Sequence, residues 1–254
     1  MQTAILTTLK EIEKTQRVKI LLAVESGSRA WGFASPDSDY DVRFLYVRSR
    51  EDYLRLDRPR DVLELPINNL LDVNGWDIDK ALKLLYRSNP TLFEWLSSPI
   101  VYLETEYAAT LRNAAEKYFV PKRALYHYHS MATGNYREYL KTDMVKAKKY
   151  FYVLRPILAC KWILAHRSPP PMLFSELMDA ELEPSLRPVV SELLELKINV
   201  PEVKQIPRIA LLNTYLENSL TEIQAQISIL PEERPNQWAG LNTLFLTALG
   251  SSCM

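Results

Sequence analysis

Short apolar runs and helical patterns alternate along the N-terminal part of the chain. Apolar side chains recur at helical spacing over residues 3–16, which predicts an amphipathic helix. Two apolar runs of strand length follow at 18–24 and 42–47, and shorter runs at 61–67 and 70–74 predict further strands. Because helices and strands are interleaved here, the pattern predicts a mixed sheet flanked by helices.

After the predicted strand at 70–74, the chain shows mainly helical patterns. Asp77 precedes an apolar stripe at helical spacing, so it is expected to cap a helix. From about residue 104 long helical patterns dominate and are interrupted by prolines. The sequence therefore predicts an α+β fold in two domains, with the sheet in residues 1–103 and a mainly helical domain in 104–254.

Composition narrows the class of protein. Of the 254 residues, 47% are hydrophobic and 24% are charged, as in a soluble globular protein, and the formal net charge is zero. The net charge of the protein therefore gives no overall electrostatic attraction to nucleic acid or to a membrane surface. Two cysteines suggest neither a disulfide framework nor a zinc site, and we see no signal peptide or membrane span. We expect a cytoplasmic protein without a membrane partner.

Local charge is less even than net charge. Residues 141–167 carry seven lysines and arginines against Asp143 alone, a net charge of +6. This segment is a candidate for contact with phosphate or RNA, and the alternative is a solvated helical face. The four residues that we expect to bind nucleotide here are Lys148, Lys149, Tyr152 and Arg155.

The candidate chemistry lies in residues 26–42. Gly27-Ser28 forms a small-residue turn after an apolar run, and such turns offer backbone N–H groups to phosphate. Asp39 and Asp41 open the next apolar run, and alternate residues of a strand point to the same face. Two convergent carboxylates hold hard divalent cations, so the stretch predicts a site for a metal-bound nucleoside triphosphate. The alternative is that both aspartates only cap turns.

A P-loop does not account for this stretch. Gly27 and Gly32 have the P-loop spacing, but Phe33 and Ala34 follow where that motif requires lysine and serine or threonine.

A different family matches better. The Gly-Ser turn, Arg29, Gly32 and Ser38-Asp39-x-Asp41 resemble the signature of the polymerase-β-like nucleotidyltransferase superfamily. Further phrases resemble its YcgL/RlaP-like branch: Gly75-Trp76-Asp77 and the segments 88–95, 98–102, 134–139 and 148–156.

The resemblance implies a nucleotidyltransferase-type sheet and transfer of a nucleoside monophosphate from a triphosphate, with ATP favoured, to a hydroxyl group. Pyrophosphate would be released, and an RNA end is the favoured acceptor. Two Mg²⁺ ions, or Mn²⁺ in their place, would neutralise the reacting phosphate. The residues expected to serve are Asp39 and Asp41 as metal ligands, and Gly27, Ser28 and Arg29 at the phosphates.

A third carboxylate is expected on a neighbouring strand, where it would bind metal and activate the acceptor hydroxyl. Asp72 ranks first because it lies in a short apolar run just before a helix. Asp77 and Glu64 are its rivals, and Asp77 is also a natural helix cap. Arg43 falls on the strand face of Asp41 and can neutralise it or contact phosphate.

Two other functions stay open at this point. The acceptor hydroxyl can belong to a protein, which would make the activity AMPylation. The chain can also be a non-catalytic module that binds nucleotide or RNA on the same fold. The presence of both aspartates and the Gly-Ser turn argues against the second alternative. The oligomeric state is not indicated.

Overall fold

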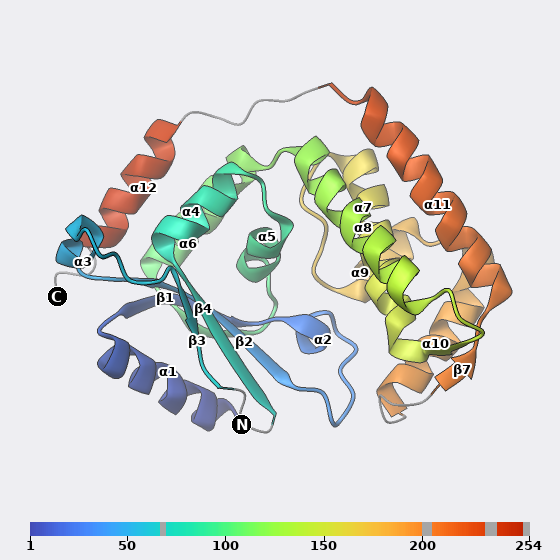
Figure 1. Ribbon diagram of the computed structural model, residues 1–254, viewed down its shortest axis with the longest axis horizontal. Helices are drawn as coiled ribbons and strands as arrows, with labels where there is room; N and C mark the ends of the chain where they lie inside the picture. Colours follow the sequence, from blue (N-terminus) through green and yellow to red (C-terminus); the bar gives the residue numbers. More distant parts are fainter. Residues whose placement is uncertain (67–69, 200–204, 232–237, 251–254) are drawn as a thin grey trace. The chain divides into compact units, whose positions relative to one another are not determined.

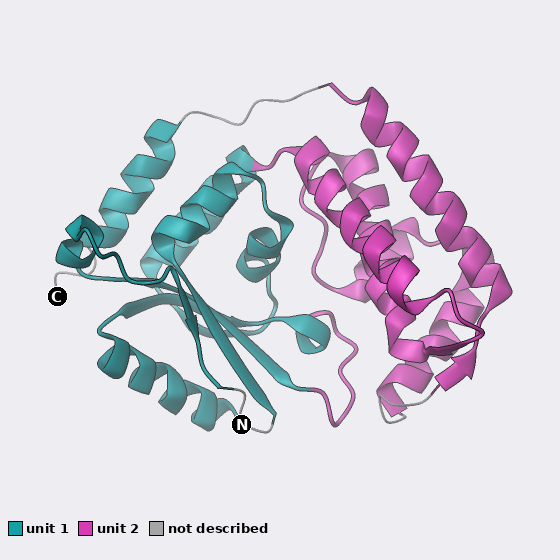
Figure 2. Ribbon diagram, in the orientation of Figure 1, with its two compact units in different colours: residues 1–30, 39–118, 235–254 teal, residues 31–38, 119–234 magenta. Residues whose placement is uncertain are grey.

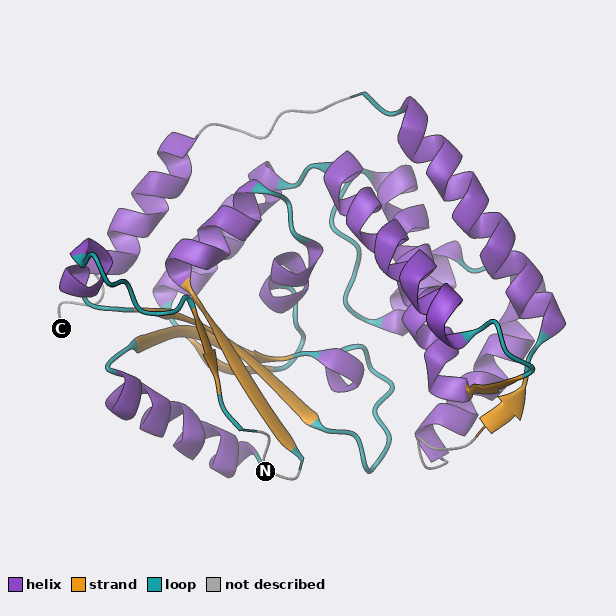
Figure 3. Cartoon of the chain, viewed as in Figure 1, coloured by secondary structure: helices purple, strands orange, loops and turns teal. Residues whose placement is uncertain are grey.

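The computed structural model describes residues 1–66, 70–199, 205–231 and 238–250. Within it the chain forms two compact units (Figure 2). Unit 1 consists of residues 1–30, 39–118 and 235–254, and unit 2 of residues 31–38 and 119–234. Helices and strands are mixed in unit 1, and helices predominate in unit 2 (Figure 3).

Unit 1 is built on a mixed sheet with the strand order β3-β4-β2-β1-β5. β2 and β4 run parallel to each other, and the other neighbouring strands run antiparallel. The five strands are β1 (Lys19–Glu25), β2 (Tyr40–Val47), β3 (Val62–Glu64), β4 (Leu71–Asp77) and β5 (Val101–Glu104).

Helices cover both faces of this sheet. Ile5, Leu9 and Ile12 of α1 are buried against one face, in a core that includes Phe44 and Tyr46 of β2. The other face carries α4 and α6 (Figure 1). The helices of unit 1 are α1 (Gln2–Gln16), α2 (Gly27–Ala30), α3 (Arg50–Leu54), α4 (Ile78–Tyr86), α5 (Pro90–Leu96), α6 (Glu106–Ala115), η1 (Glu116–Tyr118) and α12 (Trp238–Gly250).

Unit 2 has its own apolar core, in which α7 packs along α8. A short antiparallel pair, β6 with β7, lies beside these helices. The elements of unit 2 are α7 (Pro121–Tyr139), β6 (Met144–Lys146), α8 (Ala147–His166), α9 (Phe174–Glu181), η2 (Pro184–Leu186), α10 (Arg187–Asn199), β7 (Gln205–Pro207) and α11 (Ala210–Ile229).

Residues 31–38 belong to unit 2 although unit 1 elements precede and follow them in the sequence. The ring of Phe33 lies in the helical core, with its centroid 5.1 Å from Phe151 and 5.5 Å from Phe174. The buried ammonium of Lys197 donates to the Ser35 hydroxyl at 3.0 Å and the Ser38 hydroxyl at 3.4 Å. The segment is therefore held by both apolar and polar contacts.

The predicted fold class is confirmed, with a mixed sheet flanked by helices and a helical C-terminal region. The predicted strand at 61–67 is shorter here, and its last residue lies outside the described part of the chain. The compact units also differ from the boundary predicted after residue 103, because unit 1 continues to Tyr118. This grouping does not test independent folding, so the domain boundary stays a prediction.

Candidate functional site

The turn between β1 and α2 lies directly against the first residues of β2. The Ser26 N–H donates to the Asp41 carbonyl at 2.8 Å, and Gly27 has a φ of +59°. A Cβ atom on Gly27 would stand 2.1 Å from Asp41 Oδ2, so a side chain here would displace the carboxylate. Glycine is needed at this position both for its backbone conformation and for the close approach of Asp41.

Asp41 and Asp72 face each other across the parallel strands β2 and β4. Their Cα atoms are register partners. One guanidinium nitrogen of Arg43 lies 2.8 Å from both Asp41 Oδ1 and Asp72 Oδ2. The two carboxylate side chains keep 27% and 32% of their surface exposed, so solvent or a ligand can reach them.

Asp39 lies just before β2 and is exposed. Its carbonyl accepts a hydrogen bond from Arg29 Nε at 3.0 Å, and the Arg29 guanidinium stacks 3.7 Å from the Tyr40 ring centroid. The structure thus groups Gly27, Arg29, Asp39 and Asp41 at one end of β2.

Burial raises the pKa of Asp41 above its ordinary value. The positive charge of Arg43 lowers that pKa, and the negative charges of Asp72 and Asp39 raise it. Three carboxylates therefore repel one another at this end of the sheet, and an additional cation would relieve the repulsion. Carboxylate oxygens are also the ligands that Mg²⁺ prefers, so the donor set fits this ion chemically.

Among the described residues, no group of three histidine, cysteine, aspartate or glutamate side chains is arranged to hold a metal ion. The carboxylates of Asp41 and Asp72 are instead joined to each other through the Arg43 guanidinium. Metal binding and cofactor identity accordingly stay predictions.

Glu25 is a site residue that sequence reasoning missed. It is fully buried at the end of β1, and its carboxylate accepts the Asp41 N–H at 2.7 Å and the Tyr102 O–H. Burial raises the pKa of Glu25, while the hydrogen bond from Tyr102 lowers it. The available signal was a glutamate that ends an apolar strand directly before the Gly-Ser turn. The Glu25 carboxylate therefore holds the backbone N–H group of Asp41 in place.

The two rivals of Asp72 lie elsewhere in unit 1. Glu64 is exposed on β3, where its carboxylate accepts from the Asn74 amide at 3.4 Å. Asp77 is buried at the far end of β4 and caps α4 by accepting the Asp79 N–H at 2.9 Å. Neither is the register partner of Asp41. The geometry favours Asp72, whose catalytic role stays a prediction.

The four basic-helix candidates belong to α8 of unit 2 and are not equally accessible. Arg155 is only 3% exposed, and its guanidinium lies 4.7 Å from the Trp31 ring centroid. Lys149 is half-buried, with its ammonium 3.5 Å from the Tyr139 ring centroid. Lys148 and Tyr152 are also half-buried. Nucleotide binding by these residues stays a prediction, and Arg155 is the least accessible of them.

Comparisons with known proteins give a family match over nearly the whole chain. The model of the family described as RlaP, the RNA repair pathway DNA polymerase beta family, matches residues 1–247. A protein of Bacillus subtilis (strain 168) described as "Uncharacterized protein YcgL" is 46% identical over 251 residues, which cover 98% of this chain and 96% of that protein.

A solved structure, a nucleotidyltransferase-like protein from Exiguobacterium sibiricum 255-15, aligns with 99% of this chain and 89% of its own. At 12% identity and a TM-score of 0.33, this likeness carries no argument about the site. In the part of the chain that the structure describes, no helix combines the length and apolar character needed to cross a membrane.

Proposed function

We propose that this chain, which belongs to the RNA repair pathway DNA polymerase beta family, transfers a nucleoside monophosphate from a nucleoside triphosphate to a hydroxyl group. Family and fold indicate a polymerase-β-like nucleotidyltransferase. One observation supports the location of the chemistry: Asp41 is the register partner of Asp72 and also packs against the Gly27 turn. A triphosphate at the turn would thus meet both carboxylates.

In the proposed reaction the acceptor oxygen forms a bond to the α-phosphorus, and the bond from that phosphorus to the β-phosphate oxygen breaks. Pyrophosphate leaves with the electron pair. We assign the hydroxyl proton to Asp72. Asp39 and Asp41 would hold Mg²⁺, which supplies charge neutralisation at the phosphates. Ser28 and the backbone N–H groups of residues 27–29 would bind the terminal phosphates, together with Arg29.

An RNA end is the favoured acceptor. The family description names an RNA repair pathway, and residues 141–167 carry a formal net charge of +6. Arg155 is buried, whereas Lys146 and Arg167 of this segment are exposed and would attract a polynucleotide. ATP is the first donor to test. Transfer to a protein hydroxyl is the competing outcome.

The experiment uses the full chain with ATP labelled at the α-phosphate, Mg²⁺ and either an RNA oligonucleotide or a protein mixture. The expected result is label on the RNA, lowered by roughly 100- to 1000-fold in the double variant Asp39→Asn with Asp41→Asn. Asp57→Asn removes an exposed aspartate of the same unit and serves as the control. Full transfer by the double variant would contradict the site, and label on protein alone would contradict the acceptor.

A further inference from the structure

We infer that Arg43 makes the bridge between Asp41 and Asp72 that a second divalent ion would otherwise make, so that the site takes one divalent ion. The inference rests on the proposed function and concerns how its carboxylates are used. The observation behind it is the single Arg43 nitrogen that lies 2.8 Å from an oxygen of each carboxylate. A metal ion bridging the same two oxygens would have to occupy the place of that nitrogen.

The guanidinium is held in this place by the strands themselves. Its other terminal nitrogen donates to the backbone carbonyls of Val42 at 3.2 Å and Asp72 at 3.1 Å. Arg43 therefore has four acceptors, two of which are backbone atoms fixed by the pairing of β2 with β4. The side chain is only 17% exposed, so water competes weakly for these bonds. Such a planar, multiply bonded guanidinium is a fixed cation and not a loose surface charge.

The charges of the cluster agree with one ion. Glu25, Asp39, Asp41 and Asp72 contribute four negative charges, and Arg29 and Arg43 contribute two positive charges, which leaves a formal charge of −2. One divalent ion balances this charge. Without Arg43 the cluster would carry a formal charge of −3 and would attract a second ion more strongly.

The carboxylate oxygens that Arg43 does not use point to where the remaining ion would bind. Asp41 gives Oδ1 to Arg43, whereas its Oδ2 is the atom that a Cβ on Gly27 would meet at 2.1 Å. Oδ2 therefore faces the turn at which we propose that the triphosphate binds. Oδ2 would hold an ion on the side of the turn, whereas Oδ1 is bonded to Arg43. Arg43 is thus a positioning residue that joins the two carboxylates.

The test counts Mn²⁺ ions on the full chain by equilibrium dialysis, without nucleotide or acceptor. We expect the wild type to bind one ion and Arg43→Gln to bind two. Arg43→Lys keeps the positive charge and should bind one. Arg58→Gln makes the same change at an exposed arginine of unit 1 and should also bind one. Circular dichroism shows whether each variant is folded. If Arg43→Gln does not fold, the number of Mn²⁺ ions bound by the wild type still tests the inference.

Electron paramagnetic resonance adds a second readout with a non-hydrolysable ATP analogue bound. Two Mn²⁺ ions about 4 Å apart couple magnetically, whereas a single ion does not. The expected wild-type spectrum is that of an isolated ion, and the Arg43→Gln spectrum is that of a coupled pair. Two ions on the wild type, or an unchanged count in folded Arg43→Gln, would overturn this inference alone. No Mn²⁺ on any of these proteins would overturn the proposed function as well.

Discussion

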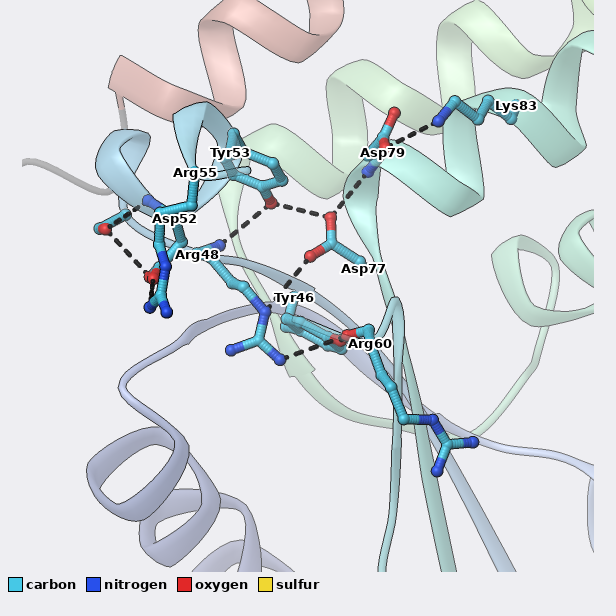
Figure 4. A network of polar contacts seen from close by, with 10 residues as sticks. Tyr46, Arg48, Asp52, Tyr53, Arg55, Arg60, Asp77, Asp79 and Lys83 are labelled. Atoms are coloured by element: carbon cyan, nitrogen blue, oxygen red, sulfur yellow. Dashed lines mark hydrogen bonds and ion pairs between the residues drawn. The ribbon is translucent and has the colours of Figure 1, made fainter. Parts of the chain in front are cut away.

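The strands β2 and β4 carry an aspartate–arginine cluster at each end, and the two clusters are built differently. At one end Arg43 joins Asp41 and Asp72. At the other end Arg48 lies 3.7 Å from Asp77, next to Tyr53 (Figure 4). The strands and the residue types are the same, so the difference lies in burial and in the remaining hydrogen-bond partners.

Asp77 is surrounded by donors from its own chain. Its carboxylate accepts the Tyr53 O–H at 2.8 Å and the Asp79 N–H at 2.9 Å, and its side chain is 5% exposed. Asp41 and Asp72 instead keep about a quarter to a third of their side-chain surface exposed. An aspartate whose oxygens accept hydrogen bonds from the protein stabilises the fold, and one with a solvent-accessible oxygen can bind a ligand. The predictions below test that contrast.

The largest effect should be on the rate of nucleotidyl transfer, when each of the two aspartates of β4 is replaced by asparagine. Asp72→Asn is expected to lower the rate of nucleotidyl transfer by roughly 100- to 1000-fold, because it removes a charge at the reacting phosphate. Asp77→Asn should leave the rate per folded molecule within about tenfold, since Asn can still accept the same hydrogen bonds. Initial rates with labelled ATP measure both. The opposite ranking would make Asp77 the third carboxylate.

The stability effects should run the other way. Asp77→Ala leaves the Tyr53 hydroxyl and the Asp79 N–H without their acceptor, and is expected to lower the free energy of unfolding by about 3 kcal/mol. Asp72→Ala loses only a partly exposed ion pair and should cost about 1 kcal/mol or less. Urea unfolding at about pH 5, where Asp77 is largely neutral, measures both. Equal losses would contradict the contrast.

The Asp77 end should also respond to pH. Burial raises the pKa of Asp77 from 3.8 to about 6. Between these values the folded chain binds more protons than the unfolded chain, so this group's contribution to stability falls as the pH rises from about 4 to about 6. The change is on the order of 2–3 kcal/mol.

Asp77→Asn keeps the hydrogen-bond acceptor and removes the ionisation, so it isolates this contribution. The free energy of unfolding of Asp77→Asn, relative to the wild type, should rise across the same pH window. A difference that does not change with pH would show that Asp77 ionises normally in the folded chain.

The smallest expected effect comes from the turn at the carboxylate end. Gly27→Ala places a Cβ against Asp41 Oδ2 in a left-handed backbone conformation, which should cost about 1–2 kcal/mol. Gly134→Ala is the matched control, because nothing lies within 4 Å of that Cβ in α7, and it should stabilise by up to about 1 kcal/mol. Thermal unfolding compares them, and a neutral Gly27→Ala would disprove the tight approach of Asp41.

Much of unit 1 was predictable because its signals are local. The apolar runs at 18–24 and 42–47 correspond to β1 and β2, and Asp77 caps α4 as expected. The Gly27 turn and Asp41, which the sequence places in one candidate site, lie in contact. Each of these features depends on residues near one another in the sequence.

The less predictable features depend on long-range pairing. Arg43 was expected on the face of Asp41, but its bond to Asp72 requires the parallel register of β2 with β4. Arg43 and Asp72 are 29 residues apart, so their pairing is not a local feature of the sequence. Glu25 was missed for the same reason, because its partner Tyr102 comes from β5. The sequence groups Arg155 with Lys148 as a nucleotide-binding candidate, whereas the burial of Arg155 beside Trp31 depends on packing within unit 2.

Residues 31–38 belong to unit 2, and this limits how the two units can be exchanged between related genes by recombination. The chain passes between the units after residues 30, 38, 118 and 234, so no single cut separates them. A fragment ending at Tyr118 would keep Phe33 without Phe151, and Ser35 without Lys197. An exchange of the helical part would therefore have to include residues 31–38. Residues 31–38, which connect the Gly27 turn to Asp41 in the sequence, depend on contacts with the helices of unit 2.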